Sequence, residues 1–107
     1  MDVNFIWIGY YKKDNHDKVW GIMSLNETTK GKDLYSIRYN IPVHVFWGGR
    51  GKSIAFKADT MSPTLAGLTS SKERKGYRQI NEAKLRQIWP DFDNTLKQRL
   101  TLHILSQ

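Results

Sequence analysis

The stretch that decides the fold is Pro42-Val43-His44-Val45-Phe46-Trp47-Gly48-Gly49-Arg50-Gly51-Lys52-Ser53-Ile54-Ala55-Phe56-Lys57. Two apolar runs flank a turn that holds three glycines within four residues. Val43, Val45 and Trp47 occupy alternate positions of the first run, which is the pattern of a β-strand. Glycine permits the positive φ angles of a tight turn. The stretch therefore predicts a β-hairpin with Arg50 and Lys52 at its tip.

Cations outnumber acids in this chain of 107 residues, with 17 Lys and Arg against 10 Asp and Glu and a net charge of +7. Such an excess is expected of a protein that meets a polyanion. Residues 41–82 alone carry seven cations and three acids. The excess therefore lies mainly around the glycine turn and in the segment that follows it.

The length allows one domain with a single hydrophobic core. The chain has no cysteine, which excludes disulfides, thiolate zinc sites and thiol nucleophiles. It has neither the N-terminal pattern of a signal peptide nor an apolar run long enough for a membrane span. We therefore expect an intracellular, cytoplasmic protein that is not exported and has no membrane partner.

Further strands are predicted before the central hairpin. Residues 3–11 and 18–25 are rich in aromatic and β-branched side chains and are separated by a polar cluster at 12–17, so they should form a hairpin. Residues 26–33 are polar and predict a loop, and residues 34–39 predict another strand. The first 58 residues should thus form a twisted antiparallel sheet of about five strands.

Helices are expected after this sheet. Ser62 followed by proline is typical of a helix start, and Gly76 of a helix end, so one helix should lie across the sheet. Asn81 can cap a second helix that ends before Pro90. Residues 91–105 fit both a helix, through apolar residues every four positions, and a strand, through alternation at 100–104. The length and the helix-forming residues favour the helix.

The fold class that follows is α+β. It comprises a single domain with an antiparallel sheet, one or more flanking helices and a helical C-terminal extension. Residues 1–82 form the sheet-and-helix module, and residues 83–107 form the extension packed on the same domain.

Catalytic and metal-binding patterns are weak. The run Gly51-Lys52-Ser53 resembles the end of a phosphate-binding loop, but the glycine required five positions earlier is Phe46 and the next segment is a predicted strand. His16, His44 and His103 are far apart and have no cysteine companions. No Gly-x-Ser-x-Gly turn surrounds a serine. We therefore expect no catalytic residues, no metal, no cofactor and no enzymatic activity.

Aromatic residues and a second basic run add to the cationic hairpin. Trp47 either packs under the hairpin or meets a sugar or base beside a phosphate held by Arg50. The basic run at residues 70–78 is either a solvated helix end or the second half of a clamp for a phosphate backbone. The aromatic residues expected in the core are Trp7, Trp20, Phe46 and Phe56.

Three motifs resemble the WGR domain, a small DNA-binding module of poly(ADP-ribose) polymerases and of bacterial regulators and stand-alone proteins. They are Val19-Trp20 on an early strand, Phe46-Trp47-Gly48-Gly49-Arg50-Gly51 at the hairpin, and Lys72-Glu73-Arg74-Lys75-Gly76-Tyr77 at a helix end. Their order and approximate spacing agree over residues 18–80. A second glycine interrupts the signature tripeptide between Trp47 and Arg50.

The resemblance implies an antiparallel sheet flanked by helices, without enzymatic activity, that contacts DNA near an end or break. Trp47 would pack against the terminal nucleotide or its sugar, Arg50 would hold phosphate, and Tyr77 would close the helix onto the sheet. Electrostatics adds further cations to this interface. The candidate nucleic-acid-binding residues are Trp47, Arg50, Lys52, Lys57, Lys72, Arg74, Lys75 and Arg78.

Two functions remain open at this point. The first is a non-enzymatic nucleic-acid-binding module that contacts the DNA backbone or DNA ends through the cationic glycine-rich hairpin. The alternative is a protein-interaction module, an adaptor or inhibitor, that uses the same fold on an acidic protein partner, because exposed aromatic and arginine side chains serve protein interfaces equally well.

Overall fold

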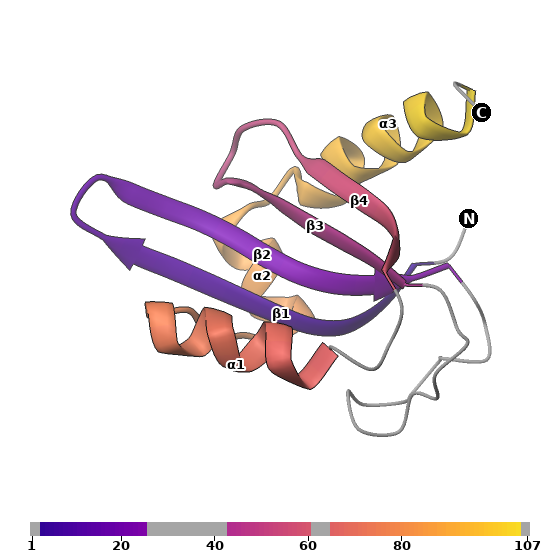
Figure 1. The fold of residues 1–107 in the computed structure, drawn as a ribbon. Helices are drawn as coiled ribbons and strands as arrows, with labels where there is room; N and C mark the ends of the chain where they lie inside the picture. Colours follow the sequence, from indigo (N-terminus) through magenta and orange to yellow (C-terminus); the bar gives the residue numbers. More distant parts are fainter. Residues whose placement is uncertain (1–2, 26–42, 61–64, 106–107) are drawn as a thin grey trace.

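The computed structural model describes residues 3–25, 43–60 and 65–105. It contains a five-stranded antiparallel sheet with the strand order β4-β3-β2-β1-β5, together with three helices (Figure 1). The expected α+β fold is confirmed. The predicted loop at 26–33 and strand at 34–39 lie outside the described residues. The fifth strand of the observed sheet is instead the short β5 (Arg78–Gln79), which pairs with β1.

The first hairpin consists of β1 (Asn4–Lys13) and β2 (His16–Ser24). Its turn is shorter than predicted, because the strands pair through most of the polar cluster and end with Lys13 opposite His16. Asp14 in this turn has a φ of 55°, a left-handed conformation that Asp tolerates better than most residues. The paired polar residues extend the hairpin beyond the apolar part of the sheet.

The second hairpin is the predicted one, with β3 (Val43–Gly49) and β4 (Ala55–Thr60). Side chains alternate between the two faces of the sheet along β3. Phe46 and Trp47 therefore point to opposite faces. Phe46 is fully buried, whereas Trp47 lies opposite Trp20 of β2 and is 42% exposed.

Three helices follow the central hairpin. The first, α1 (Leu65–Lys75), ends at Gly76, whose φ of 113° favours glycine. The second, α2 (Glu82–Ile88), begins at Asn81, whose side chain accepts a hydrogen bond from the backbone N–H of Lys84 at 2.8 Å. The third, α3 (Phe92–Leu105), confirms the helical alternative for the tail. The predicted start of α1 at Ser62 lies outside the described residues.

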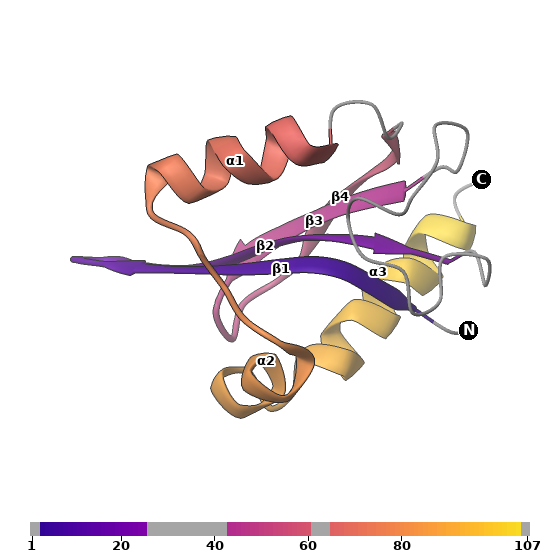
Figure 2. The ribbon, with the colours of Figure 1, turned by 90° about the horizontal axis from the view of Figure 1, so that it is seen from below.

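The helices divide unequally between the faces of the sheet. Figure 2 shows α1 on one face and α2 with α3 on the other. The face under α2 and α3 carries the larger apolar cluster, which includes Phe46, Leu85 and Phe92, each fully buried. The face under α1 carries a second cluster of Ile6, Trp7, Trp20, Ile22, Val43, Val45 and Tyr77. Of the expected aromatic core, Trp7, Trp20 and Phe46 are buried and Phe56 is half-buried.

None of the helices in the described ranges has both the length and the apolar composition that a membrane crossing requires.

Candidate nucleic-acid interface

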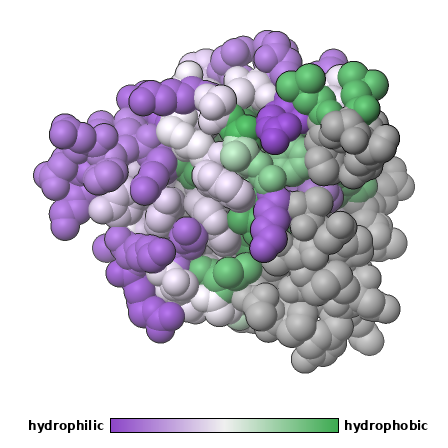
Figure 3. Space-filling view, turned by 45° about the horizontal axis from the view of Figure 1, so that its top comes forward, coloured by the Kyte–Doolittle hydropathy of each residue, from purple (hydrophilic) through white to green (hydrophobic). Residues whose placement is uncertain are grey.

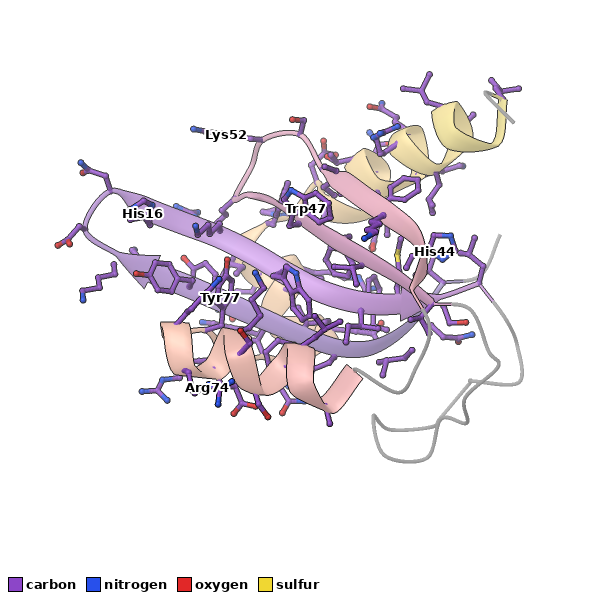
Figure 4. All side chains as sticks on the ribbon, viewed as in Figure 1. His16, His44, Trp47, Lys52, Arg74 and Tyr77 are labelled. Carbon is purple, nitrogen blue, oxygen red and sulfur yellow. The ribbon has the colours of Figure 1, made fainter. Side chains whose placement is uncertain are left out.

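A groove of about 560 Å³ opens on the α1 face, at the end of the sheet where the two hairpins turn. The first hairpin, the end of β3 with its turn, and the end of α1 all contribute to it. Figure 4 shows His16, Trp47, Lys52 and Tyr77 around this side of the sheet. The lining residues are Asn15, His16, Asp17, Lys18, Val19, Trp20, Trp47, Gly48, Gly49, Lys52, Lys72 and Tyr77.

Trp47 supplies an exposed aromatic surface at the groove. Two glycines follow it, and neither adds a side chain beside the ring. A Cβ atom on Gly48 would lie 2.4 Å from the carbonyl oxygen of Ser53, so only glycine fits where the turn closes. The turn is held by a hydrogen bond from the backbone N–H of Lys52 to the carbonyl oxygen of Gly49 at 2.9 Å. Trp47 and Lys52 are therefore presented from a closed turn.

Three lysines from three elements line the groove: Lys18 from β2, Lys52 from the β3–β4 turn and Lys72 from α1. None of them forms an ion pair with a carboxylate of residues 3–25, 43–60 or 65–105. Figure 3 shows hydrophilic surface gathered at this end of the sheet. Ammonium groups that share a groove repel one another, and an anion between them relieves that repulsion.

Lys72 lies over two aromatic rings. Its Nζ lies 5.2 Å from the centre of the Trp20 ring and 5.5 Å from that of Tyr77, both within the range of cation–π attraction. Burial lowers the pKa of Lys72, and the positive charges of Lys75 and Lys18 lower it further. The two aromatic faces thus attract the ammonium charge of Lys72, whereas the neighbouring cations repel it.

Arg50 lies where the sequence did not predict. Its Nε donates a hydrogen bond to Oδ2 of Asp17 at 2.8 Å, and its Nη1 donates to the carbonyl oxygen of Ile88 in α2 at 3.3 Å. The side chain therefore reaches the α2 face, and it does not line the groove beside Trp47. The second glycine moves the arginine one position along the chain, just past the end of β3. Because successive side chains alternate between the faces, this shift directs Arg50 to the face opposite that of Trp47.

Asp17 joins this arginine to the first hairpin. Its Oδ1 accepts a hydrogen bond from the Tyr10 hydroxyl at 2.7 Å, and its carbonyl oxygen accepts one from the backbone N–H of Arg50 at 2.9 Å. Burial raises the pKa of Asp17, but the hydrogen bonds from Tyr10 and Arg50, with the charge of Arg50, outweigh it and lower the pKa. These bonds hold the β3–β4 turn beside β2.

The other predicted cations are not among the lining residues. Lys57 is exposed on β4, and Arg78 is exposed on β5 at the opposite edge of the sheet. Lys75 is exposed at the end of α1, close enough to influence Lys72. Arg74 projects from the side of α1 turned away from the groove (Figure 4). Of the eight candidate residues, the groove brings together Trp47, Lys52 and Lys72.

Six polar or aromatic lining residues were not among the candidates from the sequence: Asn15, His16, Asp17, Lys18, Trp20 and Tyr77. One signal was present, because Lys18 precedes Trp20 by two positions and so shares its strand face. The pairing of Lys18 with Gly49, which brings the first hairpin beside the second turn, depends on strand register. Tyr77 combines the expected role with a second one, since it is buried under α1 and also lines the groove.

Possible metal ligands are not clustered in the part of the chain that the structure describes. Within it, no three His, Cys, Asp or Glu side chains are grouped so that they could hold a metal ion. Asp17, the acidic residue of the groove, already accepts hydrogen bonds from Tyr10 and Arg50.

Comparison of the chain with protein-family models, with curated proteins and with solved structures found no match.

Proposed function

We propose that this protein is a non-enzymatic nucleic-acid-binding module and that the groove on the α1 face is its binding surface. The observation that carries the proposal is the convergence of Lys18, Lys52 and Lys72 beside the exposed ring of Trp47. Lysine ammonium groups bind phosphates as point charges, and an exposed aromatic face suits a base or a sugar. A nucleic acid presents both groups at neighbouring positions.

Charge on the rest of the molecule favours the same class of ligand. The net charge of +7 raises the local concentration of a polyanion and speeds its association. Lys57, Arg74, Lys75 and Arg78 lie outside the groove lining and contribute to this general attraction. Arg50 contributes less than the sequence predicted, because Asp17 balances its charge at 2.8 Å.

DNA is the polymer we propose, on the basis of the resemblance to the WGR domain. The arrangement of strands and helices is compatible with what that resemblance implies. In this proposal Trp47 keeps the role that the resemblance implies, a contact with a nucleotide. The phosphate-holding role that it assigns to Arg50 passes to Lys52 and Lys72, which share the groove with Trp47.

The test is a pair of matched double variants. Lys52→Ala/Lys72→Ala removes two groove cations, whereas Lys84→Ala/Lys97→Ala removes two exposed cations from α2 and α3 on the opposite face. Both variants have the same net charge. Binding of a labelled DNA oligonucleotide is measured by fluorescence anisotropy over a salt series. Each lost phosphate contact lowers the slope of log K against log salt by about one.

We expect a slope reduced by about two in the groove variant and little change in the control. Equal weakening in both variants would indicate attraction to net charge alone and would contradict a defined site. Absence of binding even at low salt would contradict the nucleic-acid function. The protein-interaction alternative predicts instead a stable complex with an acidic protein that survives nuclease treatment.

A further inference from the structure

The groove has the size of a small-ligand site. Its volume of about 560 Å³ falls within the range of roughly 300–1,000 Å³ that is typical of pockets for single small molecules. The first hairpin, the β3–β4 turn and the end of α1 surround it, so the lining belongs to three separate segments. A site of this size accommodates about one nucleotide.

Trp47 adds a restriction on the state of that nucleotide. Stacking on an aromatic side chain requires an open base face. In the interior of a duplex, both faces of each base are covered by neighbouring base pairs, and the sugars and phosphates form the outer surface. An indole ring set in a groove can therefore stack only on a base that has left the duplex stack or on the outer face of a terminal base pair.

The lysines fix where the phosphate of such a nucleotide would lie. Lys52 belongs to the turn that follows Trp47, and Lys72 is held over the rings of Trp20 and Tyr77. A base on Trp47 thus places its own phosphate near the lysines. Asn15, at the tip of the first hairpin, adds an amide that can both donate to and accept from a base edge.

We propose that the groove binds one unpaired nucleotide, with the base on Trp47 and the phosphate among Lys18, Lys52 and Lys72. The nucleotide comes from a single-stranded segment, and a free mononucleotide carries the same groups. This inference rests on the proposed function and names its preferred ligand: single-stranded DNA in preference to the interior of a duplex.

The first experiment separates base pairing from strand ends. A covalently closed single-stranded circle and the matching closed duplex circle both lack ends, so a difference in affinity reports pairing alone. We expect the single-stranded circle to bind at least about tenfold more tightly, a factor within the range of base–aromatic stacking. A blunt linear duplex of the same sequence serves as the third ligand and reports the contribution of ends.

Variants of Trp47 connect this preference to the groove. Trp47→Ala should reduce affinity for the single-stranded circle by about tenfold and leave affinity for the duplex circle unchanged. Trp47→Phe keeps an aromatic face and should keep most of the preference. Because Trp47 is 42% exposed, we expect both variants to fold, and thermal unfolding checks this.

Competition tests whether a free mononucleotide also occupies the groove. Thymidine monophosphate should displace the labelled single-stranded circle, and thymidine or inorganic phosphate alone should do so at much higher concentrations. Displacement by thymidine monophosphate would show that the groove recognises a single nucleotide. Displacement by inorganic phosphate at the same concentration as the mononucleotide would overturn the role of the base.

The remaining outcomes separate this inference from the proposed function. Equal affinity for the two circles, still weakened by Lys52→Ala/Lys72→Ala, would leave a nucleic-acid-binding groove and overturn the preference for an unpaired nucleotide. Tightest binding to the blunt linear duplex would overturn it in favour of ends. Failure to bind any of the three ligands would overturn both proposals together.

Discussion

The two faces of one sheet differ in what covers them. On one face, α2 and α3 bury a cluster that includes Phe46, Leu85 and Phe92. On the other, α1 covers Trp7, Trp20 and Ile22 but leaves the groove open beside Trp47. Alternation along β3 sends Phe46 to the closed face and Trp47 to the open face, so the main core and the proposed binding surface lie on opposite faces of the sheet.

The largest expected effect comes from Phe46→Ala on the closed face. Phe46 is fully buried and its ring lies 5.8 Å from that of Phe5 and 5.6 Å from that of Phe92. Removal of the ring leaves a cavity and should lower the free energy of unfolding by about 3–5 kcal/mol. Chemical denaturation measures this loss. A loss below about 1 kcal/mol would mean that this face is not the main core.

Gly21→Ala tests the packing of the same face by adding a methyl group. A Cβ atom on Gly21 would lie 2.3 Å from the ring of Phe46 and 2.9 Å from the carbonyl oxygen of Trp7. Neither group can move freely, so we expect a loss of about 1–3 kcal/mol in the free energy of unfolding. Gly67→Ala is the control, because a Cβ atom there would meet no other part of the described structure within 4 Å beyond its chain neighbours and its own helix backbone. This control in α1 should be neutral or stabilising.

Trp47→Ala tests the open face. The side chain is partly solvated, so we expect a loss of only about 1 kcal/mol in the free energy of unfolding, well below that of Phe46→Ala. Affinity for a single-stranded oligonucleotide should fall about tenfold. Denaturation and anisotropy on the same preparation give both values. Unchanged affinity with a stability loss as large as that of Phe46→Ala would reverse the assignment of the two faces.

The smallest effect is expected from the carboxylate that joins the hairpins. The lowered pKa of Asp17 in the folded protein means that its charged form adds stability at pH values above its unfolded pKa of about 4. This contribution is lost as the pH falls through the folded pKa. Asp17→Asn should therefore flatten the acid side of the stability profile, measured by thermal unfolding between pH 7 and pH 2. A parallel profile for the variant would contradict the ion pair with Arg50.

The sequence predicted the local structure well because the signals are local. Alternation in β3, the cap at Asn81, the stop at Gly76 and the break at Pro90 each depend on a few neighbouring residues. The shorter turn of the first hairpin was not predicted, because Lys13 and His16 are polar and do not indicate a strand by themselves. They belong to the strands because they pair with each other. The helical spacing of residues 91–105 was confirmed over the strand alternative.

The candidate site was predicted only in part because it is built from three distant segments. Trp47, Lys52 and Lys72 could be selected by type, and the structure brings them into one groove. Lys18 enters through the register of β2 against β3, which the sequence does not reveal. Arg50 leaves the predicted site because a single added residue changes the face of a strand. To predict a site of this kind, one needs the register of the strands as well as the residue types.

A map of the binding surface by nuclear magnetic resonance would show which face of the sheet meets nucleic acid. Amide chemical shifts of the isotope-labelled protein are recorded while a single-stranded oligonucleotide is added. If nucleic acid binds in the groove, we expect shifts at groove amides, such as those of Lys18, Gly49 and Lys72, and little change along α3 on the opposite face of the sheet. Shifts concentrated on α2 and α3, with the groove amides unchanged, would contradict the assignment of binding to the α1 face.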